Sequence, residues 1–172
     1  VLDSGIDLAH PDLTVAGNVT FVTGTTTGDD DYGHGTLVAG IIGALDNDIG
    51  VIGVAPEAAL YAVKVLDSTG SGGMSAILSG IEWAVDNNMQ VINMSFGTPM
   101  GFPSTVVDAM TYAYNAGIAI FAGAGNGGNA DGTGENIWSP ARYAAVIAVG
   151  ATDENNARVS SSSTGATLEL MA

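Results

Sequence analysis

The sequence contains no cysteine and only three basic residues, Lys64, Arg142 and Arg158, among its 172 positions. Without cysteine there is no disulfide scaffold, no thiolate zinc site and no cysteine nucleophile. Eighteen acidic residues against three bases give a formal charge of −15. Nucleic acids and anionic membranes attract Lys/Arg patches, so we expect neither as a partner. Apolar runs such as residues 37–45 reach about nine residues, against the ~20 that span a bilayer.

Length and composition describe one globular domain, because 47% of the residues are hydrophobic and 12% are charged. The chain begins Val1-Leu2-Asp3, without methionine or a signal-like segment. We therefore expect residues 1–172 to be a partial domain of a longer protein, truncated at both ends, and expect that protein to be a monomer.

Strand-like apolar runs alternate with helical periodicity along the chain. This order predicts an α/β fold with three layers, in which helices cover both faces of a mostly parallel sheet. The expected strands are residues 1–2, 59–65, 91–94, 118–122 and 146–149, and the expected helices are residues 34–45, 74–88 and 103–115.

Functional residues in such sheets lie at the carboxyl ends of the strands. Four groups of residues follow predicted strands in this sequence: Asp3; Ser71, Gly72 and Gly73; Ser95, Phe96 and Gly97; and Asn126. We take these groups as the candidate site.

His34 lies between two glycines at the predicted start of a helix. A carboxylate at a strand end, such as Asp3, is suited to bind one ring nitrogen of a histidine and fix its tautomer. Asn126 is suited to donate its amide to a developing oxyanion. Taken singly, Asp3 is equally typical of a turn, and Asn126 followed by Gly127 of an Asn-Gly turn.

Three further patterns have simpler interpretations. Gly123, Gly125 and Gly128 satisfy the dinucleotide-binding pattern G-x-G-x-x-G, but the polar residues after them do not open a helix, so this alternative is disfavoured. The acidic residues 29–31 are interpreted as a solvated face or as a loop that leads into a helix. The acidic loop of residues 45–51 is either a solvated turn or a source of oxygen ligands for a hard cation.

Seven segments, in this order and with comparable spacing, resemble the subtilisin-like serine protease family, above all its secreted bacterial members. They are Val1-Leu2-Asp3-Ser4-Gly5-Ile6-Asp7, Gly33-His34-Gly35-Thr36-Leu37-Val38-Ala39-Gly40, Gly53-Val54-Ala55-Pro56, Val63-Lys64-Val65-Leu66, Val91-Ile92-Asn93-Met94-Ser95, Ala124-Gly125-Asn126 and Val146-Ile147-Ala148-Val149-Gly150.

The resemblance implies a role for each matching residue. Asp3 would orient the catalytic histidine, His34 would act as general base and then general acid, and Asn126 would belong to the oxyanion hole. Two backbone segments would hold an extended polypeptide substrate between them: Ser71, Gly72 and Gly73, and Ser95, Phe96 and Gly97. Ala124 and Gly125 would form part of the pocket for the residue before the scissile bond. The small residues of this cleft suggest room for large apolar groups.

The resemblance also implies a structural calcium ion. Its ligands would be the side chains of Asp12 and Asn47 and the carbonyls of Leu45, Ile49 and Val51.

The nucleophile of the family is not among these residues, since no Gly-Thr-Ser-Met-Ala-like motif occurs in the chain. We therefore expect residues 1–172 alone to be inactive and the parent protein to be an extracellular serine endopeptidase. A non-catalytic peptide-binding pseudoprotease on the same fold is the alternative.

Overall fold

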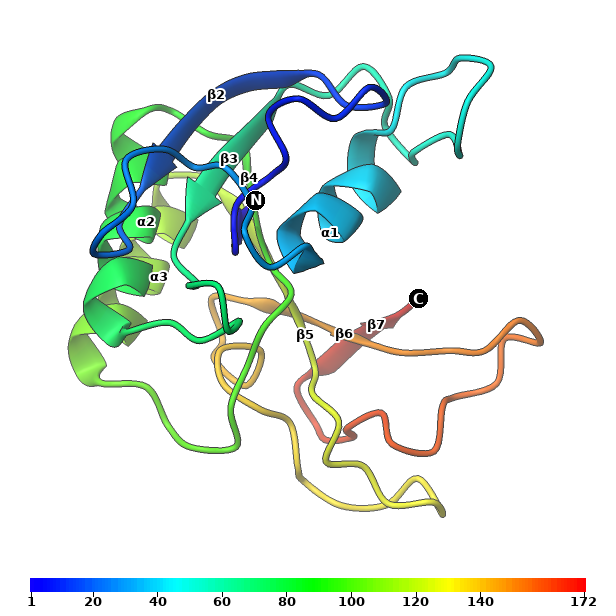
Figure 1. The fold of residues 1–172 in the computed structure, drawn as a ribbon. Helices are drawn as coiled ribbons and strands as arrows, with labels where there is room; N and C mark the ends of the chain where they lie inside the picture. The colour runs from blue at the N-terminus through cyan, green and yellow to red at the C-terminus, as the bar shows by residue number, and fades with distance from the viewer. The chain divides into compact units, whose positions relative to one another are not determined.

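The computed structural model describes all 172 residues and divides them into two compact units, Val1–Gly80 and Ile81–Ala172 (Figure 1). The elements in chain order are β1 (Leu2–Asp3), β2 (Val15–Thr20), α1 (His34–Gly43), β3 (Leu60–Lys64), α2 (Met74–Asp86), β4 (Val91–Met94), α3 (Ser104–Asn115), β5 (Ala119–Gly123), β6 (Ile147–Gly150) and β7 (Leu168–Met171).

The sheet of the first unit has the strand order β1-β3-β2, and both of its pairings are parallel. Leu2 pairs with Val63 and Asp3 with Lys64, while Thr20 of β2 also reaches Lys64 from the other side. All three strands therefore end at the same edge of the sheet, which is where the chain places Asp3.

Helices cover both faces of this sheet. Ala62 of β3 packs in one buried cluster with Ala39 of α1. On the opposite face, a Cβ added to Gly80 of α2 would lie 2.7 Å from the side chain of Val65 and 3.3 Å from that of Val63. Because successive side chains of a strand point to opposite faces, β3 meets α1 on one side and α2 on the other. The predicted three-layer α/β arrangement is confirmed.

The second unit contains a four-stranded sheet in the order β4-β5-β6-β7, again parallel throughout. Helix α3 contacts β5 and buries Val106, Met110 and Ala113 at intervals of four and three residues. Its N-cap is Pro103, whose fixed φ and missing N–H suit a helix start. At the other end, the helix is followed by Gly117, which has φ 90°.

The predicted elements all form, with ends that differ by one or two residues, but two strands were not predicted. Strand β2 contains Gly17 and Asn18, which have low strand propensity, and its register shifts next to Gly17. Strand β7 (Leu-Glu-Leu-Met) is short and mostly exposed, and its pairing with β6 is also irregular. Neither of these two sequences distinguishes a strand from a loop.

None of the helices combines the length and apolarity that crossing a membrane requires.

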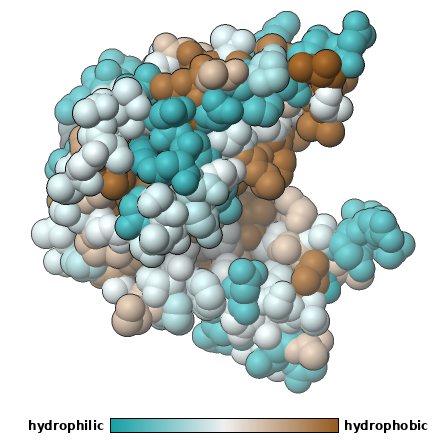
Figure 2. Space-filling view, viewed as in Figure 1, coloured by the Kyte–Doolittle hydropathy of each residue, from teal (hydrophilic) through white to brown (hydrophobic).

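The loop that follows α1 mixes hydrophilic and hydrophobic residues on its surface (Figure 2). Its apolar side chains Val51, Ile52 and Val54 are between 59% and 89% exposed, so they contribute little to the core.

We expect Leu60→Ala to destabilise the complete protein by about 2–5 kcal/mol, because Leu60 is buried and fills the space beside Gly43 of α1. Urea unfolding measures the change. Val54→Ala, at a side chain 89% exposed, is the control and should stay within about 0.5 kcal/mol. Equal effects of the two changes would contradict the assigned core.

Candidate active site

Asp3 and His34 form a hydrogen-bonded pair in the first unit. Nδ1 of His34 lies 2.7 Å from Oδ1 of Asp3. The carboxylate is fully buried, whereas the imidazole side chain is 40% exposed. A buried anion on one ring nitrogen fixes the tautomer and leaves the other nitrogen available to a substrate.

The carboxylate of Asp3 is only half satisfied. Oδ1 accepts a second hydrogen bond, from the N–H of Ser4 (2.7 Å), while Oδ2 is buried without a partner. The backbone around it is fixed, since the carbonyl of Asp3 accepts from the N–H groups of Val65 and Leu66. The unpartnered Oδ2 is an exception among buried polar atoms, most of which have a hydrogen-bond partner.

Two glycines allow α1 to start directly beside β1. Gly33, the N-cap, has φ 99°, in the left-handed region that favours glycine. A Cβ on Gly35 would lie 2.0 Å from the carbonyl oxygen of Gly5 and 3.1 Å from Cβ of Asp3. Only glycine at position 35 therefore lets the first turn of α1 approach near enough for His34 to reach Asp3.

Asp30 ties the loop before α1 to the end of β1. Its carboxylate accepts five hydrogen bonds, from Ser4 Oγ (2.8 Å), Tyr32 N (3.1 Å), Gly33 N (2.9 Å), Thr36 N (2.9 Å) and Thr36 Oγ1 (2.6 Å). Burial would raise the pKa of Asp30, but hydrogen bonds from Thr36, Gly33 and Tyr32 outweigh it and lower the pKa to about 2. Ser4 Oγ in turn accepts from the N–H of Gly35 (2.9 Å).

The interpretation of residues 29–31 as a solvated face is wrong for Asp30, whereas Asp29 and Asp31 are exposed. Asp30 forms the network above, and Asp31 binds the ammonium group of Lys64 at 2.5 Å. Lys64 is fully buried in β3 and also donates to the carbonyl of Ser4. The available signal was the position of Asp30, four residues before His34 and within reach of the amides at a helix start.

Ser71, Gly72 and Gly73 lie in the loop after β3, at the same edge of the sheet as Asp3. Asp67 accepts hydrogen bonds from Thr69 and from the N–H of Ser71, and these bonds lower the pKa of its carboxyl. A Cβ on Gly72 would lie 2.6 Å from Leu66, so the loop packs closely on the strand it follows.

The second unit contains a pocket at the carboxyl ends of β4 and β5. Its walls include Ser95, Phe96 and Gly97 after β4, and Ala124, Gly125 and Asn126 after β5. The backbone after β5 is held in place: the N–H of Ala124 donates to Val149, and the N–H of Gly127 donates to Ser163 Oγ. No helix follows Gly123, Gly125 and Gly128, so the dinucleotide-binding alternative lacks its structural context.

The structure thus brings together Asp3 with His34 in one unit, and six predicted residues around one pocket in the other. Trp138, which also lines that pocket, was missed. It lies in a loop more than ten residues from Asn126, and no local pattern connects the two positions.

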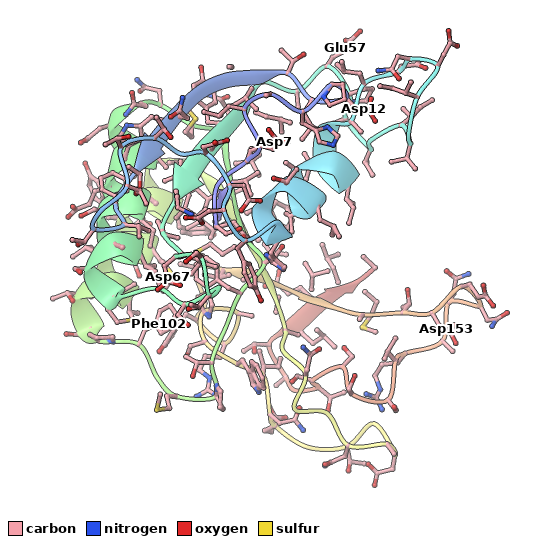
Figure 3. All side chains as sticks on the ribbon, viewed as in Figure 1. Asp7, Asp12, Glu57, Asp67, Phe102 and Asp153 are labelled. Carbon is pink, nitrogen blue, oxygen red and sulfur yellow. The ribbon has the colours of Figure 1, made fainter.

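The predicted calcium ligand Asp12, labelled in Figure 3, lies in the segment before β2 and contacts Leu45 and Asn47 of the loop after α1. Asp12 is 5% exposed; its carbonyl accepts from the N–H of Leu45 (3.1 Å), and its Oδ1 from Nδ2 of Asn47 (2.8 Å). A Cβ on Gly50 would lie 2.4 Å from Oδ2 of Asp12, so the loop encloses the carboxylate. No basic side chain pairs with this buried anion.

No cluster of three or more His, Cys, Asp or Glu side chains that could hold a metal is present. Apart from the carboxylate of Asp12, the ligands of an ion at this position would therefore be amide and carbonyl oxygens. Calcium accepts such ligands, and the chemistry of the donor set fits it.

The chain matches the family model described as the Subtilase family over residues 1–172. The chain belongs to the subtilase family. It is 52% identical over its whole length to subtilisin DY of Bacillus licheniformis and covers 62% of that protein. It is 54% identical to subtilisin E of Bacillus subtilis strain 168 and 49% to the thermostable alkaline protease of Halalkalibacterium halodurans, again over its whole length, and covers 45% and 46% of them. This subtilase chain thus spans about half to three fifths of the length of these relatives.

We expect Asp30→Asn to destabilise the complete subtilase at neutral pH, because the amide group opposes backbone N–H donors where the carboxylate accepted them. The pKa of about 2 lies below the ordinary value of 3.8, so the stabilisation is present above pH 4 and is lost as the pH falls toward 2. Because the carboxylate is partly exposed, we expect about 1–2 kcal/mol. Urea unfolding from pH 6 to pH 2 measures it.

The control is Asp29→Asn, at an exposed neighbour. The gap in unfolding free energy between the wild type and Asp30→Asn should close below pH 4, and the Asp29 variant should show no such trend. A gap for Asp30→Asn that is constant over the whole pH range would contradict this assignment.

Proposed function

We propose that the parent protein of this chain is a serine endopeptidase. The observation that carries the proposal is the hydrogen bond between the buried carboxylate of Asp3 and the accessible imidazole of His34. Membership of the subtilase family supports it, as do relatives named subtilisins. The nucleophilic serine is proposed to come from a part of the protein outside residues 1–172, and these residues alone are proposed to be inactive.

In this mechanism His34 takes the proton of the serine hydroxyl through its free ring nitrogen as the hydroxyl attacks the peptide carbonyl. Asp3 keeps the proton-bearing Nδ1 in place and stabilises the imidazolium that forms. The histidine then gives its proton to the leaving amine, and water hydrolyses the acyl-enzyme by the same route in reverse.

Asn126 is proposed to donate its side-chain amide to the oxyanion of the tetrahedral intermediate. Its backbone is held by its fixed neighbours in the wall of the pocket, which suits a donor that must be in place before charge develops. The segments 71–73 and 95–97 are proposed to hold an extended polypeptide through backbone hydrogen bonds, and the pocket to receive the side chain before the scissile bond.

We expect Asp3→Asn to reduce kcat of the complete protein by about 10⁴-fold, because the wrong tautomer of His34 would be favoured. Asn126→Ala should reduce kcat by about 10²–10³-fold, the loss that this change causes in a subtilisin. Hydrolysis of peptide p-nitroanilides measures both.

Asp108→Asn, at an exposed carboxylate of α3, is the matched control and should keep the wild-type rate. Unchanged rates in both Asp3→Asn and His34→Ala would reject the mechanism. A complete protein that binds peptides without cleaving them, and carries no reactive serine, would be the pseudoprotease instead.

We also propose that a calcium ion binds at Asp12 and Asn47, with the carbonyls of Leu45, Ile49 and Val51 as further ligands. The buried, enclosed carboxylate of Asp12 supports this site. The amide of Asn47 now satisfies that carboxylate by hydrogen bonding. With calcium bound, the ion would take over this role and the amide would present its oxygen. The ion would stabilise the loop and take no part in the reaction.

Removal of calcium from the complete protein with EGTA should lower its Tm, since an ion at 100 times its Kd contributes about 2.7 kcal/mol to folding. Asp12→Asn should abolish most of this difference, whereas Asp48→Asn, in the same loop but exposed, should retain it. Differential scanning calorimetry with and without calcium measures the effect. An Asp12 variant that responds to calcium like the wild type would place the ion elsewhere.

The substrates are proposed to be polypeptides met outside the cell, where the parent protein would act as a monomer. The absence of cysteine is compatible with this location, because calcium rather than disulfides would reinforce the fold.

A further inference from the structure

We propose that Trp138 sets the specificity of this protein by closing the inner end of its substrate pocket, so that only small, uncharged side chains are accepted before the scissile bond. This inference rests on the proposed peptidase function. It reverses the expectation from the sequence, in which glycine and alanine walls suggested room for large apolar groups.

The segment that carries Trp138 is hydrogen-bonded to both walls of the pocket. The N–H of Trp138 donates to the carbonyl of Ala124 (2.9 Å). The next residue, Ser139, exchanges two hydrogen bonds of 2.9 Å with Thr98. One wall follows β4 and the other follows β5, so this segment bridges them where they leave the sheet. The backbone at residues 138–139 therefore closes the gap between the walls.

The indole ring lies against the wall that contains the oxyanion residue. A Cβ on Gly125 would lie 2.4 Å from Cγ and 2.6 Å from Cδ2 of Trp138, and a Cβ on Gly127 would lie 2.8 Å from Nε1. The ring thus lies along the backbone that runs from Gly125 through Asn126 to Gly127. Tryptophan is the largest side chain, and a ring in this position occupies space that a substrate side chain would otherwise enter.

The lining explains why the accepted side chain should also be uncharged. The pocket side chains that residues 1–172 supply are those of Ser95, Phe96, Asn126 and Trp138 together with glycine, alanine and valine, and none of these is acidic or basic. A lysine or arginine side chain would lose its hydration there without meeting a carboxylate. Size then decides among the neutral residues, and steric exclusion by the indole ring is a strong way to reject a larger competitor.

The test measures kcat/KM of the complete protein on succinyl-Ala-Ala-Pro-X-p-nitroanilides in which X is Ala, Leu or Phe. The wild type should prefer Ala over Phe by at least ~10-fold, in line with the 10–200-fold that a difference in fit within an apolar pocket gives. Trp138→Ala should reduce this ratio at least ~10-fold by improving turnover of the Phe substrate. Trp83→Phe, on α2, is the matched control and should leave the ratio unchanged.

A wild type that cleaves the Phe substrate as well as the Ala substrate would overturn the proposal, and so would an unchanged ratio in Trp138→Ala. Should that variant not fold, Trp138→Leu and Trp138→Phe provide the comparison, with ratios expected between those of the wild type and an open pocket.

Failure of the peptidase function itself gives a different result, namely no turnover of any of these substrates. In that case isothermal titration calorimetry of the complete protein measures binding of succinyl-Ala-Ala-Pro-Ala and succinyl-Ala-Ala-Pro-Phe. Tighter binding of the Ala peptide would still support a pocket closed by Trp138. Equal or tighter binding of the Phe peptide would overturn it.

Discussion

The pairing of Asp3 with His34 depends on how closely the first turn of α1 approaches the end of β1. The backbone at Gly35 packs against the carbonyl of Gly5 with no room for a side chain. Any larger residue would push α1 outward and lengthen the bond between His34 and Asp3. Such an approach costs the chain the conformational entropy of a glycine in a helix, about 0.5–1 kcal/mol. That cost is small compared with the loss of reaction rate that a 1 Å displacement of a catalytic group causes.

Three aspartates lie around this contact, and each has a different set of partners. Asp3 stays buried with one unsatisfied oxygen, Asp30 accepts five hydrogen bonds, and Asp31 pairs with Lys64. The two outer carboxylates bind partners in the same unit, and these contacts fix the loop that presents His34. Among the buried carboxylate oxygens, Oδ2 of Asp3 keeps accepting capacity in reserve. A buried acceptor with spare capacity stabilises a neighbouring cation, which suits a histidine that must gain a proton during turnover.

The sequence alone predicted the layers of the fold and the pairing of Asp3 with His34. Continuous apolar runs identified the buried strands, and glycines around a histidine marked a close approach. What it could not predict came from long-range geometry. Strand β2 exists because Val15 to Thr20 can pair with β3, despite a glycine and an asparagine inside it. Asp30 resembled a solvated residue because its partners are mostly backbone amides, which every sequence contains. Trp138 is joined to the pocket by one hydrogen bond, from its N–H to the carbonyl of Ala124, and no sequence motif connects the two residues.

The three basic side chains of this chain all bind groups of the chain itself. Lys64 is buried with Asp31, and the guanidinium of Arg142 donates twice to the carbonyl of Ile137. Arg158 donates to five backbone carbonyls, those of Asn129, Ala130, Val159, Ser160 and Ser162. Each base thus satisfies groups of its own chain. In a chain with a formal charge of −15, the few cations therefore serve to satisfy buried and loop carbonyls and one carboxylate.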